Sequence, residues 1–224
     1  MDNIYFSLII LIADVFLLYL VSRKTINEIF NSLMIVTKTK GIVYSLASLI
    51  FFPGTAIHEL AHFFMATVLF IKVREFKIFP EWYGGRIRLG TVVMEKKDFL
   101  RGILVGIAPL FAGFAFFWWL SAFKIFPNSS LLLNAILIYF MFCVSTTMFS
   151  SYEDLKELIN TVPFLILIGV GLYLFDIRVD LNLISSGRLI KIIKDINTYL
   201  FYSLIINVVI VVILKSFRFG VTKK

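Results

Sequence analysis

The sequence predicts an α-helical polytopic membrane protein with about six transmembrane helices and a membrane-associated β-hairpin. Three observations support this fold class. Hydrophobic residues make up 60% of the chain and charged residues only 16%, and the mean hydropathy is +0.94. The apolar residues gather in runs of membrane-spanning length, and one connection between two runs has the residue pattern of strands. No soluble domain of this size needs so much apolar surface, so we expect a multi-pass integral protein of the cell membrane.

Each transmembrane helix needs about 20 predominantly apolar residues. Six runs come close to this length, at residues 4–21, 42–71, 99–123, 131–149, 162–175 and 199–214. The second run is longer than one crossing needs and contains Pro53-Gly54. It is therefore either one tilted or kinked helix or a short re-entrant piece followed by a span. Ahead of the last run, apolar and basic residues mix over 178–197, which predicts an amphipathic helix lying at the membrane interface.

The connection after the second run predicts a β-hairpin over residues 73–94. Its two arms, 73–79 and 86–94, are rich in β-branched and aromatic residues with partial polar and apolar alternation, and Pro80-Glu-Trp-Tyr-Gly-Gly85 between them is a turn signal. Two interpretations remain open. Trp82 and Tyr83 can anchor the hairpin at headgroup level, or an exposed strand edge can pair with an extended peptide.

The only two histidines of the chain lie in the motif His58-Glu59-Leu60-Ala61-His62, inside the second apolar run. On a helix, residues four apart lie on one face, one turn from each other. Two neutral imidazoles at this spacing can hold a zinc ion, and Glu59 can accept a proton from a water molecule that the metal activates. Two imidazoles and a carboxylate in hydrocarbon would cost several kcal/mol without partners, and a bound divalent cation removes that cost. We therefore expect Zn²⁺ as cofactor.

The net charge of +8 indicates contact with the anionic headgroups of the lipid bilayer. Nucleic acid is a poor partner for this chain, because the basic residues lie between the apolar runs and form no separate domain.

The chain resembles the site-2 protease family of intramembrane zinc metalloproteases over residues 54–155. The resemblance rests on the His-Glu-Leu-x-His helix, the hairpin that follows it, and a span that contains Gly106-Ile-Ala-Pro109 and Gly113. Because apolar runs extend along the whole chain, we expect one integral membrane domain over residues 1–224. An N-terminal span and its connection (1–40) precede a metalloprotease-like core (41–155), and C-terminal spans with the interfacial helix follow (156–224).

A catalytic zinc generally has three protein ligands and one open position. In the resembling family the third ligand is an aspartate on a later span, usually in a Leu-Asp-Gly or Asn-Pro-Asp-Gly context that does not occur here. Asp154, after the fourth apolar run, matches the expected chain order best. It can also favour the dipole of a helix that Ser151 caps. Other carboxylates remain as alternatives, namely Glu153, Glu157 and the intramembrane Asp14.

These residues predict an intramembrane zinc metalloprotease that hydrolyses peptide bonds of membrane proteins at or within the bilayer. Metal ligands are His58, His62 and Asp154, and Glu59 is the catalytic acid–base group. Two other functions share the motif. One is a zinc-dependent membrane hydrolase of a lipid or small amide, and the other is a non-catalytic metal-binding membrane protein.

Overall fold

The structure is a computed structural model. Among the residues that it describes, two long helices come first in the chain, four short strands follow, and further helices complete it. The structure describes residues 4–78, 81–83, 86–88, 90–95, 98–149, 163, 166–175 and 187–222. The helices are α1 (Ile4–Thr37), α2 (Lys40–Val68), α3 (Phe99–Ala122), α4 (Leu131–Thr147) and α7 (Gly187–Thr222). Of these, α1, α2, α3 and α7 are long and apolar enough to cross a membrane.

The expectation of about six spans is met only in part. The fourth expected span is the apolar helix α4, which has 17 residues. The fifth expected span, 162–175, lies partly outside the described residues, and its described helical stretch is 166–174.

Two helices are longer than the apolar runs that predicted them. The expected connection after residue 21 is helical and continues α1 to Thr37. Two of its charged residues have partners: Arg23 lies over the ring of Tyr19, and Glu28 pairs with Arg218 of α7 at 3.5 Å. The interfacial helix and the last span likewise form one helix, α7, over the described residues from Gly187. Hydropathy therefore missed the polar extension of α1, whereas the described part of the expected interfacial helix forms the first turns of α7.

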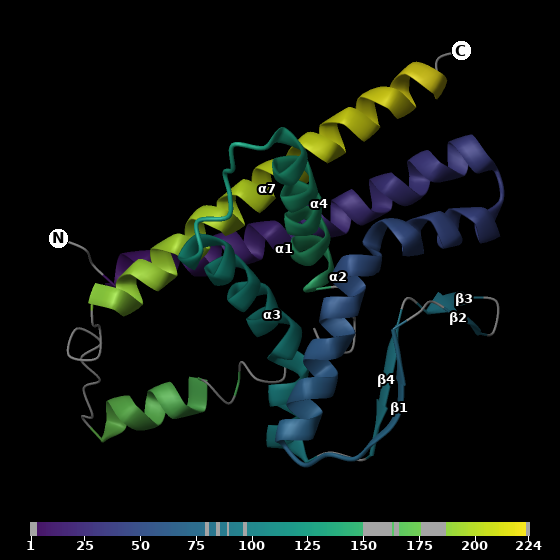
Figure 1. Ribbon diagram of the computed structural model, residues 1–224. Coiled ribbons are helices and arrows are strands. Elements are labelled where there is room, and N and C mark those ends of the chain that lie inside the picture. The colour runs from purple at the N-terminus through teal and green to yellow at the C-terminus, as the bar shows by residue number, and fades with distance from the viewer. Residues whose placement is uncertain are drawn as a thin grey trace.

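Helices α1 and α7 lie side by side and run in the same direction, as Figure 1 shows. Asn197 Nδ2 donates to the carbonyl of Ser7 near the start of both helices, at 3.0 Å, and the Glu28–Arg218 pair joins them nearer their ends. The main hydrophobic core lies between helices α1 and α7 on one side and helices α3 and α4 on the other. Its fully buried members include Leu18, Phe117, Leu120, Met141 and Leu200.

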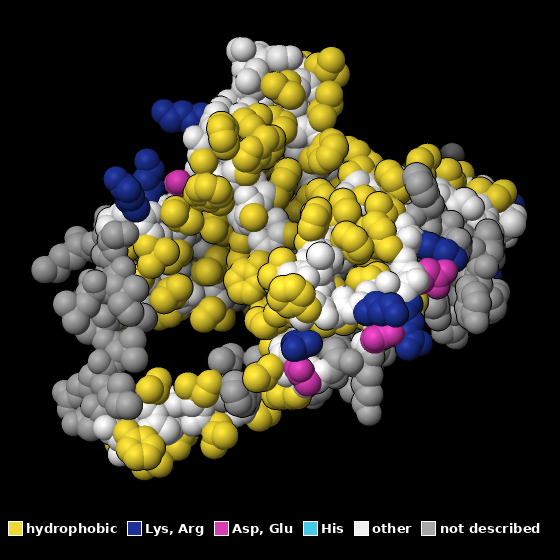
Figure 2. Space-filling view, turned by 60° about the horizontal axis from the view of Figure 1, so that its bottom comes forward, with side chains coloured by type: hydrophobic (Ala, Val, Ile, Leu, Met, Phe, Trp, Pro, Cys, Tyr) yellow, Lys and Arg dark blue, Asp and Glu magenta, His cyan; other side chains and the backbone are white. Residues whose placement is uncertain are grey.

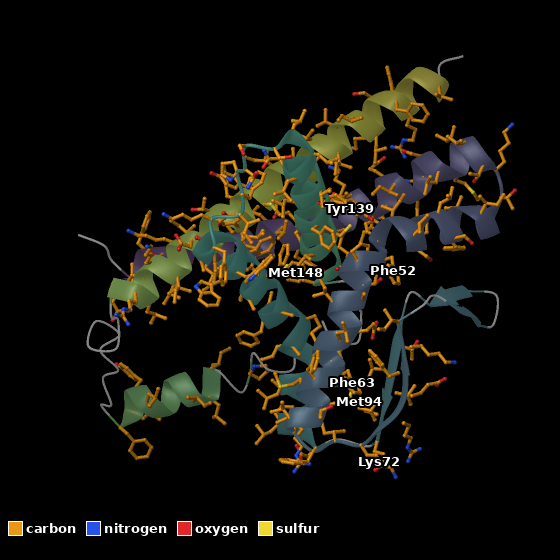
Figure 3. The ribbon with its side chains drawn as sticks, viewed as in Figure 1. Phe52, Phe63, Lys72, Met94, Tyr139 and Met148 are labelled. Atoms are coloured by element: carbon orange, nitrogen blue, oxygen red, sulfur yellow. The ribbon has the colours of Figure 1, made fainter. Side chains whose placement is uncertain are left out.

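The second apolar run forms one helix that bends at Pro53, which settles the two alternatives in favour of a kinked helix. Proline lacks an N–H and its ring crowds the preceding turn, so carbonyls there lose their helical donors. The carbonyl of Ile50, three residues earlier, accepts from the Tyr139 hydroxyl at 2.9 Å and from Cys143 Sγ at 3.2 Å. Figure 3 shows Tyr139 of α4 beside this bend. Helix α4 thus stabilises the kink that precedes the two histidines.

The expected hairpin is present and consists of two consecutive ladders. Strand β1 (Val73–Lys77) pairs antiparallel with β4 (Thr91–Met94), and β2 (Glu81–Tyr83) pairs antiparallel with β3 (Arg86–Arg88). The β1–β4 ladder lies along the second half of α2 (Figure 1), and the ring centroids of Phe63 on α2 and Phe76 on β1 are 4.7 Å apart. The hairpin is therefore packed on the helix that carries the histidines.

The surface is apolar and part of the interior is polar. Figure 2 shows hydrophobic side chains over most of one face, with charged side chains gathered towards its borders. On α1, Ile12 is 70% exposed, whereas Asp14 is 9% exposed and Thr25 is fully buried. Asn207 of α7 is also fully buried, where it donates to Ser145 Oγ and accepts from Thr146 Oγ1 of α4, both at 3.1 Å. Polar groups thus join helices inside the bundle.

Candidate metal centre

The two histidines lie on one face of α2 and point their Nε2 atoms at each other. His58 is 4% exposed and His62 is 7% exposed. Their Nε2 atoms are 3.2 Å apart, and the two rings are nearly perpendicular, at 86°. Spacing of four residues on a helix accounts for this proximity, as the sequence predicted.

The other ring nitrogen of His62 is held by helix α3. His62 Nδ1 lies 2.9 Å from the carbonyl oxygen of Val105. Because a carbonyl can only accept, Nδ1 carries the hydrogen, and Nε2 of the neutral ring presents its lone pair. Val105 stands four residues before Pro109. Since Pro109 has no N–H, the Val105 carbonyl has no helical donor at that position and is available to His62.

This arrangement fits a zinc ion. Two Zn–N bonds of about 2.0–2.1 Å at a tetrahedral angle place their nitrogen atoms about 3.3–3.4 Å apart. The Nε2–Nε2 distance of 3.2 Å is close to that value. Metal-bound histidines commonly donate their second ring N–H to a carbonyl or carboxylate, as His62 does to Val105. The Nε2–Nε2 distance also fits a single N–H···N hydrogen bond from His58 to His62. The geometry therefore allows a zinc ion but does not require one.

Glu59 lies beneath the hairpin, where β4 begins. A Cβ atom added to Gly90 would come within 2.5 Å of Glu59 Cγ and 3.0 Å of Oε1. Glycine at this position lets the backbone just before β4 approach the Glu59 side chain this closely. The Glu59 side chain is partly buried. The hairpin and the motif helix therefore meet at the carboxylate that the sequence predicts as the acid–base group.

Glycine also sets the position of α2 one turn before His58. A Cβ atom at Gly54 would contact the Cys143 carbonyl, and it would lie 2.5 Å from Thr147 Oγ1. Helices α2 and α4 thus cross backbone to backbone at Gly54. On α3, a Cβ at Gly113 would lie 2.7 Å from Met148 Cε, so the end of α4 fits against this glycine. The small residues of the Gly106-Ile-Ala-Pro109 span face inward, with Gly106 and Pro109 both buried.

Asp154, the expected third metal ligand, lies outside the described residues, and so do Glu153 and Glu157. Within the part of the chain that the structure describes, no group of three or more His, Cys, Asp or Glu side chains is placed to hold a metal. Asp14 therefore does not join the histidines: it is buried on α1, one turn before the core residue Leu18. The metal-ligand role of Asp154 remains a prediction.

Sequence reasoning missed three residues of this site, namely Val105, Gly90 and Gly54. A signal for Val105 was present, because a proline inside an apolar helix always leaves the carbonyl four residues earlier without its donor. Which donor takes that position depends on the packing of α3 against α2. The roles of Gly90 and Gly54 also depend on tertiary packing, since Gly90 approaches Glu59 and Gly54 approaches Cys143.

Comparison with family models, with curated proteins and with solved structures finds no match for this chain.

Proposed function

We propose that the chain is a membrane-embedded zinc hydrolase that cleaves peptide bonds of membrane proteins. The observation that carries this proposal is the pair of buried Nε2 atoms 3.2 Å apart, one of them on a ring whose Nδ1 is fixed by the Val105 carbonyl. A catalytic glutamate adjoins the first histidine in the chain, which is the motif of metalloproteases. The resemblance to the site-2 protease family supports the same class.

The membrane environment is supported by four helices of crossing length and by the distribution of side chains. Large apolar residues are exposed on the outer faces of helices, such as Ile12 at 70% and Leu49 at 71%. In water this surface would promote association, whereas in a bilayer it is solvated by lipid chains. Buried polar contacts such as Asn207 with Ser145 are typical of interfaces between membrane helices.

His58 and His62 would hold the metal, with Asp154 as the proposed third ligand. A bound zinc ion supplies a Lewis acid and lowers the pKa of water towards neutrality. Val105 keeps the Nε2 lone pair of His62 directed at His58 and so prepares the site. Glu59 accepts a proton from the attacking water and passes it to the leaving amine. The buried position of both imidazoles limits access of bulk water to the site.

A peptide substrate must reach the site in an extended form, because an intact helix hides its carbonyls in its own hydrogen bonds. The hairpin provides strands close to Glu59, since β4 begins beside Gly90. An extended segment can pair with a strand edge through main-chain hydrogen bonds that are independent of its sequence. We therefore propose that the hairpin aligns the substrate over Glu59.

The Glu59→Gln variant tests this function. We expect the variant to keep its zinc and to lose cleavage of single-span reporter proteins embedded with it in liposomes, because glutamine cannot accept the proton. Glu75→Gln is the control, since Glu75 lies on β1 and pairs with Lys77. Cleavage at the wild-type rate by Glu59→Gln would contradict the proposal. Zinc-dependent cleavage of lipids by the wild type, with no polypeptide cleaved, would assign the alternative lipid or amide substrate.

A further inference from the structure

A second site lies at the opposite end of α3 from Val105, where α3 ends against the first turns of α7 (Figure 1). It is a pocket of about 610 Å³. Three basic side chains line it: Lys124 follows α3, and Arg188 and Lys191 stand three residues apart on α7. Asp195 is the acidic residue of the lining, so the charged groups sum to +2. The pocket therefore favours an anion.

The apolar part of the lining indicates what kind of anion. Trp118, in the last full turn of α3, and Tyr199 of α7 line the pocket together with the basic residues. Tryptophan and tyrosine are enriched where a membrane helix leaves the hydrocarbon, and lysine and arginine there attract anionic headgroups. The apolar sequence of α3 ends at this level, and the strongly apolar part of α7 begins at about Tyr199. The lining thus combines positive charge with surface suited to a lipid chain.

The pocket walls are fixed by hydrogen bonds. Tyr199 donates its hydroxyl proton to the Phe126 carbonyl at 2.7 Å, which joins α7 to the connection after α3. Asn134, in the first turn of α4, binds the backbone of Asn128 in the same connection twice, accepting from its N–H and donating to its carbonyl, both at 2.7 Å. A preformed wall reduces the entropy cost of binding.

None of the three cations has an ion-pair partner within the described ranges of the chain. The ion pairs of these ranges involve other basic residues, such as Lys77 with Glu75 and Arg218 with Glu28. Lys124, Arg188 and Lys191 are all exposed. Their charges are therefore available to a ligand, which would have to supply the neutralising groups itself.

We propose that this pocket binds the headgroup of one anionic phospholipid, with the phosphate neutralised by Lys124, Arg188 and Lys191 and an acyl chain lying along Trp118. The inference rests on the membrane placement proposed above. It does not depend on the metal centre, and its test measures lipid binding and not hydrolysis, so either proposal can fail alone.

The test uses the purified full-length protein in detergent micelles and native mass spectrometry with phosphatidylglycerol as the probe. We expect the wild type to bind one phosphatidylglycerol more tightly than phosphatidylcholine. The variant Lys124→Gln/Arg188→Gln/Lys191→Gln should weaken this binding about a hundredfold, at about fivefold for each charge. The matched control is Lys38→Gln/Lys40→Gln/Lys215→Gln, which removes three exposed charges elsewhere. It also matches the backbone, since Lys38 and Lys124 have φ values of 55° and 51°.

A second variant guards against misfolding of the triple variant. Asp195→Asn removes the carboxylate of the lining, and we expect it to tighten phosphatidylglycerol binding about fivefold. Unchanged or weaker binding by Asp195→Asn would overturn the proposal, as would equal losses in the triple variant and its control. Inorganic phosphate is the competitor that separates a lipid site from a site for a free anion. Failure to displace the lipid supports the proposal, and displacement as effective as that by added phosphatidylglycerol overturns it.

Discussion

His62 Nδ1 lies 2.9 Å from the carbonyl oxygen of Val105, and that carbonyl belongs to the turn that Pro109 interrupts. The relationship joins two features that are 43 residues apart in the chain. A proline is usually considered for the bend it causes in a helix. Here its missing N–H has a second consequence, because the acceptor that it leaves open orients an imidazole of the candidate metal centre.

The Pro109→Ala variant tests this relationship. The backbone N–H that alanine adds at this position can donate to the Val105 carbonyl within the helix, and it then competes with His62 Nδ1. We expect the zinc affinity of the purified protein to fall about 10- to 100-fold, which is the usual effect of losing such a partner. Competition with a zinc chelator measures the affinity. Phe111→Ala is the control, because Phe111 is exposed on the same helix. Equal affinity in Pro109→Ala and wild type would show that Pro109 has no part in the site.

The close approach of Gly90 to Glu59 predicts that Gly90→Ala separates binding from catalysis. The added Cβ displaces either the Glu59 carboxylate or the start of β4. A displacement of about 1 Å can cost about a hundredfold in rate, while the zinc content should not change. The measurements are reporter cleavage, bound zinc, and amide hydrogen exchange of Thr91–Met94, which should become faster. Gly171→Ala is the matched control, since a Cβ there meets nothing within 4 Å. Wild-type cleavage and exchange in Gly90→Ala would contradict the packing of the hairpin on Glu59.

The crossing of α2 and α4 at Gly54 predicts a loss of stability in Gly54→Ala. The new methyl group would overlap the Cys143 backbone, which cannot yield as a side chain can. We expect the free energy of unfolding to fall by about 1–3 kcal/mol. The midpoint of thermal unfolding in detergent reports this change. Gly220→Ala adds the same methyl group in open space and should leave the midpoint unchanged. If both variants unfold at the same temperature, the helices do not cross at Gly54.

The buried Asn207 predicts a smaller effect. Asn207→Ala removes the hydrogen bonds to Ser145 and Thr146 that join α7 to α4. Both hydroxyls also bond to the Phe142 carbonyl in their own helix, so they keep one partner. We therefore expect a loss of only about 1 kcal/mol in the free energy of unfolding, within the range measured for polar contacts between membrane helices. Asn31→Ala, at an exposed position of α1, is the control. If Asn207→Ala loses no more unfolding free energy than Asn31→Ala does, the hydrogen bonds of Asn207 to α4 do not stabilise the protein.

The histidine pair could be predicted from the sequence because helical spacing alone brings residues four apart onto one face. The hairpin was predictable for a similar reason, since alternation and turn residues are local signals. The extent of α1 was not, because hydropathy registers Arg23 and Glu28 as the end of a span. Tyr19 lies one turn before Arg23 on the same helix, whereas only the tertiary structure supplies Arg218 of α7 as the partner of Glu28.

The surroundings of the histidines could not be predicted, because each contact depends on which helices pack together. Val105 reaches His62 only through the packing of α3 on α2. Gly90 and Gly54 have sequence signals no stronger than those of other glycines, and their roles appear only when Glu59 and Cys143 are placed against them. Asp154 stays a prediction from chain order and resemblance.

The zinc content of the purified protein tests the central claim most directly. It should be measured in detergent for the wild type, His58→Ala and Asp154→Ala. Loss of zinc only in His58→Ala would move the third ligand to another residue. The account predicts about one zinc ion per wild-type chain, lost in both variants because a catalytic site needs three protein ligands. A wild-type protein that binds no zinc would contradict it.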